Sequence, residues 1–240
     1  MTNKKVLVTG ASKGIGKSIA KLFAQNGYDV YICARNLETL QKTAKEINAK
    51  KFFSCDITDF NACKKMIEDI NGVDILINNA GAYVWSSVEK TSNKDISSLL
   101  DLNIKAPYSL ITLCVEHMKN QKWGRIINIG SISGVVGEAN ASLYSMTKSA
   151  MNGLTKALGL ELAEYGITVN TINPGWVETD LAENAIEDGD FSAEEIKDMI
   201  PQRRFIEPTE IANLAKYLAT EEAKGITAQN ISLCAGLSAG

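Results

Sequence analysis

Short apolar runs alternate with longer segments of helical period along the chain. The alternation begins with an apolar run at Val6–Thr9, helical spacing from Lys17 to Gln25, and a second apolar run at Val30–Cys33. Runs rich in β-branched residues predict strands, whereas apolar positions three and four apart predict helices. Five further strands are predicted at Lys51–Ser54, Asp74–Ile77, Arg125–Ile129, Thr168–Ile172 and Asn230–Leu233, with helical stretches between them.

Such strand–helix–strand units predict an α/β fold: a doubly wound, Rossmann-type parallel sheet of about seven strands with helices on both faces. Parallel strands require crossover connections, and right-handed crossovers lay the helices against the sheet. The chain has 240 residues, which one α/β domain can accommodate, and it contains no proline-rich linker or internal repeat. We therefore expect residues 1–240 to form a single domain.

One segment departs from this regular alternation. Nine acidic residues gather between Glu178 and Asp198, together with Gly189 and few strand-forming residues. Insertions between regular elements are frequently mobile and functional. We interpret residues 178–205 as a substrate flap, and a solvated acidic surface loop is the alternative interpretation.

Charge excludes several classes of partner. Lys and Arg total 25 and Asp and Glu total 28, so the net charge of −3 provides no positive field for nucleic acid or an anionic membrane. No apolar run approaches the roughly 18 residues of a membrane span, and the N-terminus has no signal-peptide pattern. We expect a cytoplasmic protein with no nucleic-acid and no membrane partner.

The cysteines point to the same compartment. The five cysteines form no CxxC pair, and His117 is the only histidine, so the spacing of a zinc site is missing from the sequence. An odd count, with two cysteines in apolar strand-like runs, fits buried reduced thiols. We predict no metal site and a reducing environment.

A glycine-rich turn directly follows the first predicted strand. The segment TGASKGIG spans Thr9 to Gly16 and leads into helical spacing. Glycines there permit a tight bend and a close approach of pyrophosphate to the backbone, and N–H groups at the helix N-terminus bind phosphates. An ordinary turn is the alternative, and the position after the first strand argues against it. The candidate cofactor residues are Gly10, Ser12, Lys13, Gly14, Ile15 and Gly16.

The end of the second strand indicates which dinucleotide is bound. A site for NAD places an acidic residue there, about 20 residues after the glycines, to hold the ribose hydroxyls. This chain has the segment CARN at positions 33–36, and Arg35, with Lys13 from the turn, would pair with a 2′-phosphate. The sequence therefore favours NADPH/NADP+. In the alternative, Arg35 is a solvated loop charge and Glu38 holds the ribose.

A tyrosine and a lysine four residues apart lie in a long predicted helix, Ser142–Tyr165. Tyr144 and Lys148 share one face of that helix, a single turn apart. An ammonium about 4 Å from a phenol contributes up to about 4 kcal/mol at an effective dielectric of 20, enough to lower the pKa of the phenol by roughly three units. Such a phenol exchanges a proton with a carbonyl oxygen as hydride arrives.

Three strand ends place polar groups or bare backbone beside this pair. Ser131, the segment Asn78–Gly81 and the segment Asn173–Gly175 each lie at the end of a predicted strand. In an open parallel sheet, ligands bind in the crevice at the carboxyl ends of the strands. We expect these residues to share one crevice with Tyr144 and Lys148.

Together these motifs resemble the short-chain dehydrogenase/reductase family over essentially all 240 residues. The matching segments are TGASKGIG at 9–16, NNAG at 78–81, Asn103, Ser131, YSMTK at 144–148 and NPG at 173–175. The resemblance implies that Tyr144 is the general acid/base, that Lys148 lowers its pKa and binds the nicotinamide ribose, and that Ser131 polarises the substrate carbonyl. It implies further that Asn103 holds a water linking Lys148 to solvent.

The resemblance also implies the remaining cofactor contacts and an assembly. The contacts are Asp56 and Ile57 near the adenine, Asn79, Ala80 and Gly81 along the ribose, and Pro174, Gly175, Val177 and Thr179 around the nicotinamide and phosphates. The assembly is a homotetramer, or a homodimer, built on the helix that carries Tyr144 and the helix before it. Gly153 and Gly159 lower helix stability within that helix and are candidate subunit contacts.

Within the family, the chain is similar to the β-ketoacyl carrier-protein reductases and the aromatic polyketide ketoreductases. The similarity lies in VYICAR at 30–35, TKALGLELAEYGITVN at 155–170 and TAQNISLCAG at 227–236. It implies NADPH-dependent reduction of a ketone to a secondary alcohol, on a β-ketoacyl thioester carried by acyl carrier protein or CoA. Lys119, Lys122 and Arg125 form a candidate basic patch for an acidic carrier, with a solvated helix end as the alternative.

Aromatic residues supply candidates for an apolar substrate pocket. They are Tyr83, Trp85, Trp176 and Phe191, and ordinary packing is the alternative for Tyr83 and Trp176.

Two other functions stay open. One is a short-chain dehydrogenase acting on a sugar, a steroid or a simple alcohol, because fold and chemistry do not fix the substrate. The other is a non-catalytic NADP-sensing protein. The intact set of Asn103, Ser131, Tyr144 and Lys148 argues against a sensor, because a pure binder needs neither an acid nor a proton relay.

Overall fold

One parallel sheet organises the fold. In the computed structural model, which describes residues 3–188 and 192–239, seven strands run in the order β3-β2-β1-β4-β5-β6-β7. Every neighbouring pair is parallel. The chain winds outward from β1 to β3 and then returns to the other side of β1 with β4, which makes the sheet doubly wound. The predicted fold class is confirmed.

All seven predicted strands are present, with small shifts at their ends. They are β1 (Lys5–Thr9), β2 (Asp29–Ala34), β3 (Lys51–Ser54), β4 (Ile75–Asn78), β5 (Gly124–Ile129), β6 (Ile167–Pro174) and β7 (Gln229–Leu233). The helices are α1 (Gly14–Gln25), α2 (Leu37–Ile47), α3 (Phe60–Ile70), α4 (Asn93–Leu100), α5 (Ala106–Gln121), α6 (Ser133–Val136), α7 (Ser142–Glu161), α8 (Asp180–Asp188), α9 (Ala193–Met199) and α10 (Pro208–Leu218). Shorter turns are η1 (Val88–Lys90), the π-helical η2 (Asp101–Lys105) and η3 (Ala163–Tyr165).

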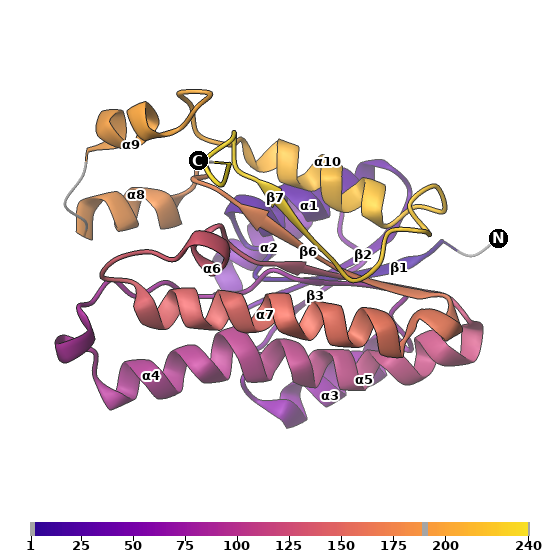
Figure 1. The fold of residues 1–240 in the computed structure, drawn as a ribbon. Helices are drawn as coiled ribbons and strands as arrows, with labels where there is room; N and C mark the ends of the chain where they lie inside the picture. Colours follow the sequence, from indigo (N-terminus) through magenta and orange to yellow (C-terminus); the bar gives the residue numbers. More distant parts are fainter. Residues whose placement is uncertain (1–2, 189–191, 240) are drawn as a thin grey trace.

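Helices cover both faces of the sheet (Figure 1). The helices α1, α2 and α10 pack on one face, and α3, α5 and α7 pack on the other. Strand β1 shows how the sequence divides between the two cores, since Val6 and Val8 pack under α1 whereas Leu7 packs on the opposite side. All three side chains are fully buried. Burial on both faces explains why the strands are continuous apolar runs in the sequence.

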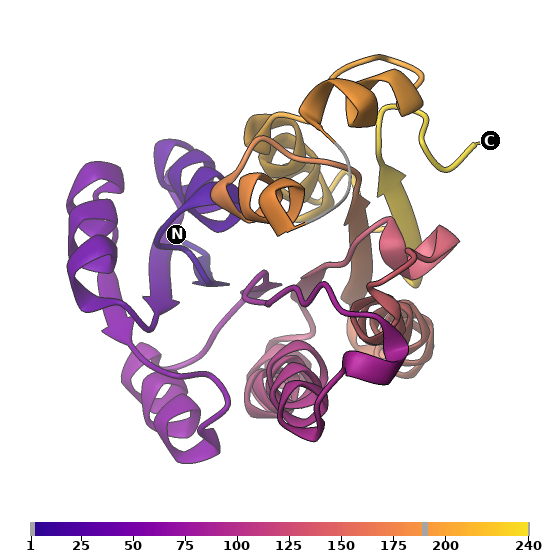
Figure 2. The same cartoon turned by 90° about the vertical axis from the view of Figure 1, so that its left-hand side faces the viewer.

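The segment predicted to be a flap contains α8 and α9. Figures 1 and 2 show both helices at one end of the molecule, and Ala185 and Ile196 line a cleft there together with Gly130, which directly follows β5. Phe191 lies outside the described residues. The role of residues 178–205 as a flap stays a prediction.

The helix that carries Tyr144 is shorter than predicted. α7 ends at Glu161, and the chain continues as the short turn η3 before Gly166, whose φ is +69°. Gly159 has a packing role within the chain, because a Cβ there would lie 2.6 Å from the backbone nitrogen of Ala228. The close approach of Ala228 therefore explains a glycine at this position without a subunit contact. A Cβ at Gly153 would meet no atom within 4 Å.

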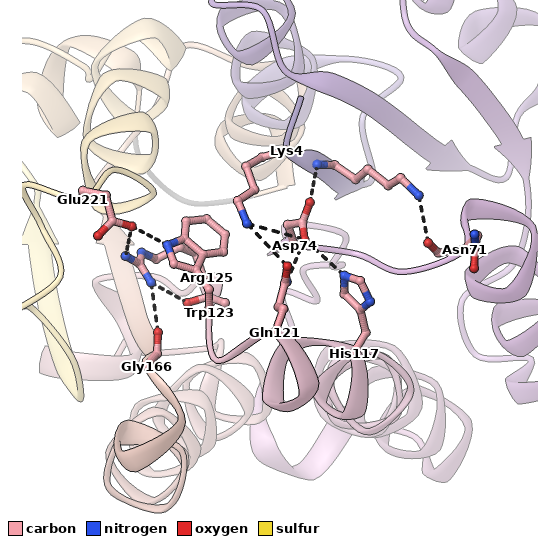
Figure 3. Close-up of polar contacts among 11 residues, drawn as sticks. Lys4, Asn71, Asp74, His117, Gln121, Trp123, Arg125, Gly166 and Glu221 are labelled. Carbon is pink, nitrogen blue, oxygen red and sulfur yellow. Dashed lines mark hydrogen bonds and ion pairs between the residues drawn. The ribbon is translucent and has the colours of Figure 1, made fainter. Parts of the chain in front are cut away.

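Paired charges occupy the amino ends of the strands (Figure 3). Asp74, directly before β4, accepts hydrogen bonds from the backbone nitrogen of Lys5 at 2.8 Å and from Nε2 of Gln121 at 2.7 Å. Its Oδ1 also lies 3.1 Å from Nε2 of His117, and Lys4 Nζ lies 3.9 Å away. His117 on α5 is thus part of a polar cluster between α5 and the sheet.

A second cluster surrounds Arg125 at the start of β5. Its side chain is 1% exposed, donates hydrogen bonds to the carbonyls of Gly124 at 2.8 Å and Gly166 at 3.2 Å, and pairs with Glu221 at 3.2 Å. The guanidinium also lies 4.4 Å from the ring centroid of Trp123. The prediction that Arg125 joins a basic patch is wrong, because burial and pairing remove its charge from the surface.

Among the residues that the structure describes, no helix has both the length and the apolar character that a membrane crossing requires.

Candidate active site

The glycine-rich turn between β1 and α1 packs tightly on the segment after β4. Gly10 and Gly14 have φ values of +63° and +54°, which favour glycine. A Cβ at Gly10 would lie 2.8 Å from Cα of Ala80, and one at Gly16 would lie 2.5 Å from Nδ2 of Asn79. Side chains at these positions would push the two segments apart.

The N-terminus of α1 has no side-chain cap. Lys13 occupies the N-cap position, its side chain makes no capping hydrogen bond, and the first turn carries no acidic residue. By contrast, α2 and α3 are capped by the side chains of Asn36 and Asp59. The N–H groups of the first turn and the positive end of the helix dipole are therefore suited to an anion. Gly14 and Ile15 line the cleft at this point.

Hydrogen bonds fix the NNAG segment beside the turn. Thr9 Oγ1 accepts from the backbone nitrogens of Asn79 and Ala80, both at 3.0 Å. Asn79 Nδ2 donates to the carbonyl oxygen of Thr9 at 2.9 Å. Because β1 and β4 flank the point where the strand order reverses, these bonds hold the two walls of the crevice together.

Arg35 lies in the cleft where the sequence places it. It follows β2, is exposed, and lines the cleft together with Asp56 and Ile57. None of the ion pairs among the described residues involves Arg35. Hydrogen bonds from Thr58 hold the pKa of Asp56 below its usual value, and the charge of Arg35 lowers it further.

Lys13 lines the cleft and also forms an ion pair. Its ammonium lies 2.6 Å from Oδ2 of Asp180, the first residue of α8, and both side chains are mostly exposed. The ammonium thus bridges the glycine-rich turn to the segment predicted to be a flap, and its role beside Arg35 at a 2′-phosphate stays a prediction.

Tyr144 and Lys148 lie on one buried face of α7. Tyr144 is 9% exposed and Lys148 is 7% exposed. Lys148 Nζ lies 5.6 Å from the centroid of the Tyr144 ring and donates a hydrogen bond to the carbonyl oxygen of Ile129, the last residue of β5, at 2.9 Å. The predicted shared face is therefore present, and the lysine also ties α7 to the end of a central strand.

The predicted lowering of the tyrosine pKa is wrong for this structure. Burial raises the pKa of Tyr144 to about 12, the hydrogen bond with Ser131 opposes that rise, and the charge of Glu138 adds to it. Burial lowers the pKa of Lys148 to about 8. Burial disfavours the charged form of each group and sets the direction of both shifts, whereas the prediction took only the attraction between the two groups into account. At neutral pH the phenol accordingly retains its proton.

Ser131 lies directly beyond the end of β5. Its backbone nitrogen donates to Oδ1 of Asn173 at 3.1 Å, and its hydroxyl donates to Oγ of Ser133 at 3.1 Å. The hydroxyl is also hydrogen-bonded to Tyr144. Ser131, Tyr144 and Lys148 all line the same cleft.

Asn103 lies behind these residues instead of in the cleft wall. It is 2% exposed and belongs to the π-helical turn η2 between α4 and α5, a distortion frequently found at functional sites. Its Oδ1 accepts from the backbone nitrogen of Ala82 at 3.0 Å, and its Nδ2 donates to Ala82 O at 3.0 Å and to Thr147 Oγ1 at 3.1 Å. The relay role of Asn103 stays a prediction.

The chain after β6 forms the opposite wall of the cleft. Val177 is buried and pairs with Ile206 in an isolated bridge. A Cβ at Gly175 would lie 3.0 Å from Cα of Cys234, so the backbone passes close to the segment after β7. Pro174, Gly175, Val177 and Thr179 all line the cleft, as predicted.

The whole cleft has a volume of about 1280 Å³ and brings nearly all the predicted site residues together. Tyr83, Trp85 and Trp176 form apolar walls, as predicted. Gly16 and Asn103 do not line the cleft, since they support it from behind.

The sequence reasoning missed Ser133 and Glu138, which do line it. Both residues lie between Ser131 and Tyr144, and this position could have identified them as candidates. The sequence of such a short irregular segment does not reveal which of its side chains turn into the cleft.

Comparison with known proteins places the chain in a family. A model of the short chain dehydrogenases matches residues 4–190. The chain belongs to the short-chain dehydrogenase family.

Individual relatives agree over almost the whole length. The 3-oxoacyl-[acyl-carrier-protein] reductase FabG of Staphylococcus epidermidis is 36% identical, with 98% of this chain and 99% of that protein covered. The structure of a variant of the actinorhodin polyketide ketoreductase with NADPH has a TM-score of 0.93 at 33% identity, covering 98% of this chain and 97% of that one. The structure of ElxO with NADP bound has a TM-score of 0.91 at 30% identity and covers 100% of both chains.

Proposed function

We propose that this protein uses NADPH to reduce a ketone to a secondary alcohol, and that the ketone is a β-ketoacyl thioester. The observation that carries the proposal is the convergence of Ser131, Tyr144 and Lys148 on one cleft with an uncapped helix N-terminus and an exposed arginine. Reductases of 3-oxoacyl and polyketide substrates are among the relatives that match the full chain. The dehydrogenase of another substrate and the NADP sensor are accordingly not favoured.

The cleft fits NADPH at its phosphate groups. A Cβ at Gly14 would lie 3.3 Å from Thr179 Cγ2, so the glycine leaves a narrow passage for pyrophosphate at the start of α1. Arg35 would hold the 2′-phosphate through charge-assisted hydrogen bonds. Asn79, Ala80 and Gly81 would border the ribose. When bound, the cofactor supplies hydride to the carbonyl carbon of the substrate.

Tyr144 would supply the proton. Because burial keeps the phenol protonated, with a pKa of about 12, it is in the form required to donate to the carbonyl oxygen during reduction. Ser131, hydrogen-bonded to the phenol, would hold the same oxygen in place. The nearby ammonium of Lys148 would stabilise the phenolate that remains.

The substrate would lie between the aromatic walls and the segment of α8 and α9. Tyr83 and Trp85 flank the Tyr144 side of the cleft, and Ile186 and Met199 line the other. Apolar walls with a few polar anchors suit an acyl chain. With Arg125 buried, a carrier protein could use only Lys119 and Lys122 of the predicted patch.

The assembly and the location belong to the same proposal. We propose a homotetramer or a homodimer, for which Gly153 on α7 offers a face without neighbouring atoms. A cytoplasmic location is supported by five free cysteines.

Replacing Tyr144 with Phe tests the function. We expect turnover of an acetoacetyl thioester to fall by about 10²–10⁴-fold, the usual contribution of a general acid, with NADPH affinity close to that of the wild type. The decrease in NADPH absorbance measures turnover, and fluorescence titration measures affinity.

Tyr217→Phe provides the matched control, because Tyr217 is 48% exposed on α10. It should reduce the thioester at the wild-type rate. Wild-type turnover in Tyr144→Phe would refute the role of the phenol. A wild-type protein that binds NADPH tightly but reduces no ketone of a broad panel would return the sensor to consideration.

A further inference from the structure

A carboxylate that the sequence did not single out contacts two residues that each lead to Tyr144. Glu138 lies in the loop between α6 and α7 and lines the cleft. Its Oε1 accepts a hydrogen bond from the hydroxyl of Tyr83 at 2.8 Å, and its Oε2 accepts one from the hydroxyl of Ser133 at 2.6 Å. The bond from Ser133 is at the short end of the range for hydroxyl donors, as expected when the acceptor is charged, and the bond from Tyr83 has an ordinary length.

Each of these two hydroxyls belongs to a side chain that leads to Tyr144. The ring of Tyr83 packs edge-on against the ring of Tyr144, with centroids 4.9 Å apart and planes at 75°. On the other arm, Ser133 accepts the hydroxyl of Ser131 at 3.1 Å and returns a bond from its backbone nitrogen to Ser131 Oγ at 3.1 Å. Ser131 in turn is hydrogen-bonded to Tyr144.

The loop that carries Glu138 is itself held by backbone hydrogen bonds. The backbone nitrogen of Ala141, the residue before α7, donates to the carbonyl oxygen of Glu138 at 3.2 Å. The carbonyl oxygen of Asn140 accepts from the backbone nitrogen of Ser86 at 2.6 Å, which ties the loop to the segment that carries Tyr83. These bonds hold the backbone around Glu138 in place independently of the contacts of its side chain.

We propose that Glu138 is a positioning residue that fixes the hydroxyl of Tyr144 for proton donation, through Ser133 and Ser131 on one side and Tyr83 on the other. The inference rests on the proposed function for its kinetic consequence. Its structural content, the control of the Tyr144 environment, is independent of which ketone is reduced.

The chemistry of the donors explains the arrangement. A carboxylate only accepts hydrogen bonds, so the single hydroxyl proton of Ser133 is directed to Glu138 and its lone pairs face Ser131. The backbone N–H of Ser133 donates to Ser131 Oγ, and the proton of Ser131 is directed back to Ser133 Oγ, so the two serines hold each other in one orientation. The groups with charge or a titratable hydroxyl that face Tyr144 are Lys148 from its own helix, Glu138 from the preceding loop and Tyr83 from the segment after β4.

The first experiment compares Glu138→Ala, Glu138→Gln and the control Glu161→Gln, which makes the same chemical change on an exposed face of α7. We expect Glu138→Ala to lower kcat by about 10–100-fold, because small misplacements of reacting groups carry such losses. Glu138→Gln keeps one acceptor and should recover part of the loss, and Glu161→Gln should match the wild type. NADPH affinity should be unchanged in all three.

A double variant tests the route of the effect. If Glu138 acts through Ser133, then Ser133→Ala combined with Glu138→Ala should lose less than the product of the two single losses, because both changes break one chain of hydrogen bonds. Losses that multiply in the double variant would overturn the proposed route.

The second experiment needs no substrate and separates this inference from the proposed function. In protein with 13Cζ-labelled tyrosine, the signal missing from Tyr144→Phe is that of Tyr144. We expect this signal to shift in Glu138→Ala, to return part of the way in Glu138→Gln, and to stay in place in Glu161→Gln. If the wild-type protein reduces no ketone, the proposed function is refuted. The shifts of the Tyr144 signal would still support the positioning role of Glu138. An unmoved Tyr144 signal in Glu138→Ala, or wild-type kcat in that variant, would overturn it.

Discussion

The two edges of the sheet contain similar residue types that are used in opposite ways. At the amino edge, Asp74 and Arg125 are largely buried, and each is held by several hydrogen bonds or ion pairs (Figure 3). At the carboxyl edge, Arg35 is exposed and forms no ion pair among the described residues, and α1 begins without a side-chain cap. The charges at the amino edge are paired within the protein, whereas the carboxyl edge exposes groups that can bind a ligand.

The difference shows where the fold places stability and where it places binding. The carboxyl ends of parallel strands lead into loops at the point where the strand order reverses, and a crevice forms there. The amino ends receive the chain from the helices, and polar side chains there are covered by helix ends and by the last turns before each strand. Changes at the amino edge should therefore alter the free energy of unfolding, and changes at the carboxyl edge should alter binding and turnover.

The largest effect on stability is expected at the amino edge. Arg125→Ala should lower the free energy of unfolding by about 3 kcal/mol, because it removes a fully buried side chain and leaves the Gly124 and Gly166 carbonyls without a donor. Urea denaturation followed by circular dichroism measures the loss. Glu221→Gln is the control, because Glu221 is mostly exposed, and it should cost about 1 kcal/mol or less.

The comparison predicts that the folded fraction of Arg125→Ala keeps wild-type kinetics. If its kcat/KM fell by more than about tenfold at a temperature where it is folded, the amino edge would be coupled to turnover and the division between the edges would fail.

A smaller effect is expected at the carboxyl edge. Arg35→Ala should weaken NADPH binding by about 10–100-fold and leave NADH binding nearly unchanged, because a charge-assisted bond to the 2′-phosphate is lost. Thermal shifts with each cofactor report the two affinities, and the free energy of unfolding without cofactor should stay within about 0.5 kcal/mol. Unchanged NADPH affinity in Arg35→Ala would instead favour the alternative in which Arg35 is a solvated loop charge and Glu38 holds the ribose.

The smallest effect is a pH dependence at the amino edge. Although burial opposes it, hydrogen bonds from Lys5, Gln121 and His117 hold the pKa of Asp74 below its usual value. A lowered folded-state pKa contributes stability that is present above the unfolded pKa of about 3.9 and is lost as the pH falls through the folded value. Asp74→Asn should therefore cost about 1 kcal/mol at pH 7.

Urea unfolding of Asp74→Asn and the wild type at neutral and acidic pH checks the sign. The difference between the two proteins should shrink as the pH falls below about 4. A difference that grows in acid would contradict the assigned direction of the pKa shift.

The fold class and the place of the cleft follow from features visible in the sequence. Both faces of each strand are buried, so the strands are continuous apolar runs, and the glycines of TGASKGIG mark the first strand-to-helix turn. The spacing of Tyr144 and Lys148 predicted their shared face because helical geometry is local. The family resemblance, now supported by the match over residues 4–190, added Asn103 and the segment after β6.

Burial and pairing were decided only by the tertiary structure. The partners of Arg125, Lys13 and Glu138 lie 96, 167 and 55 residues away in the chain, on Glu221, Asp180 and Tyr83. No local pattern reports such pairs, which is why the placement of Arg125 in a basic patch was wrong and Glu138 was missed. The pKa of Tyr144 shows the same division: helical spacing placed a cation near the phenol, but the solvent that the folded chain excludes from both groups determines the direction of the shift.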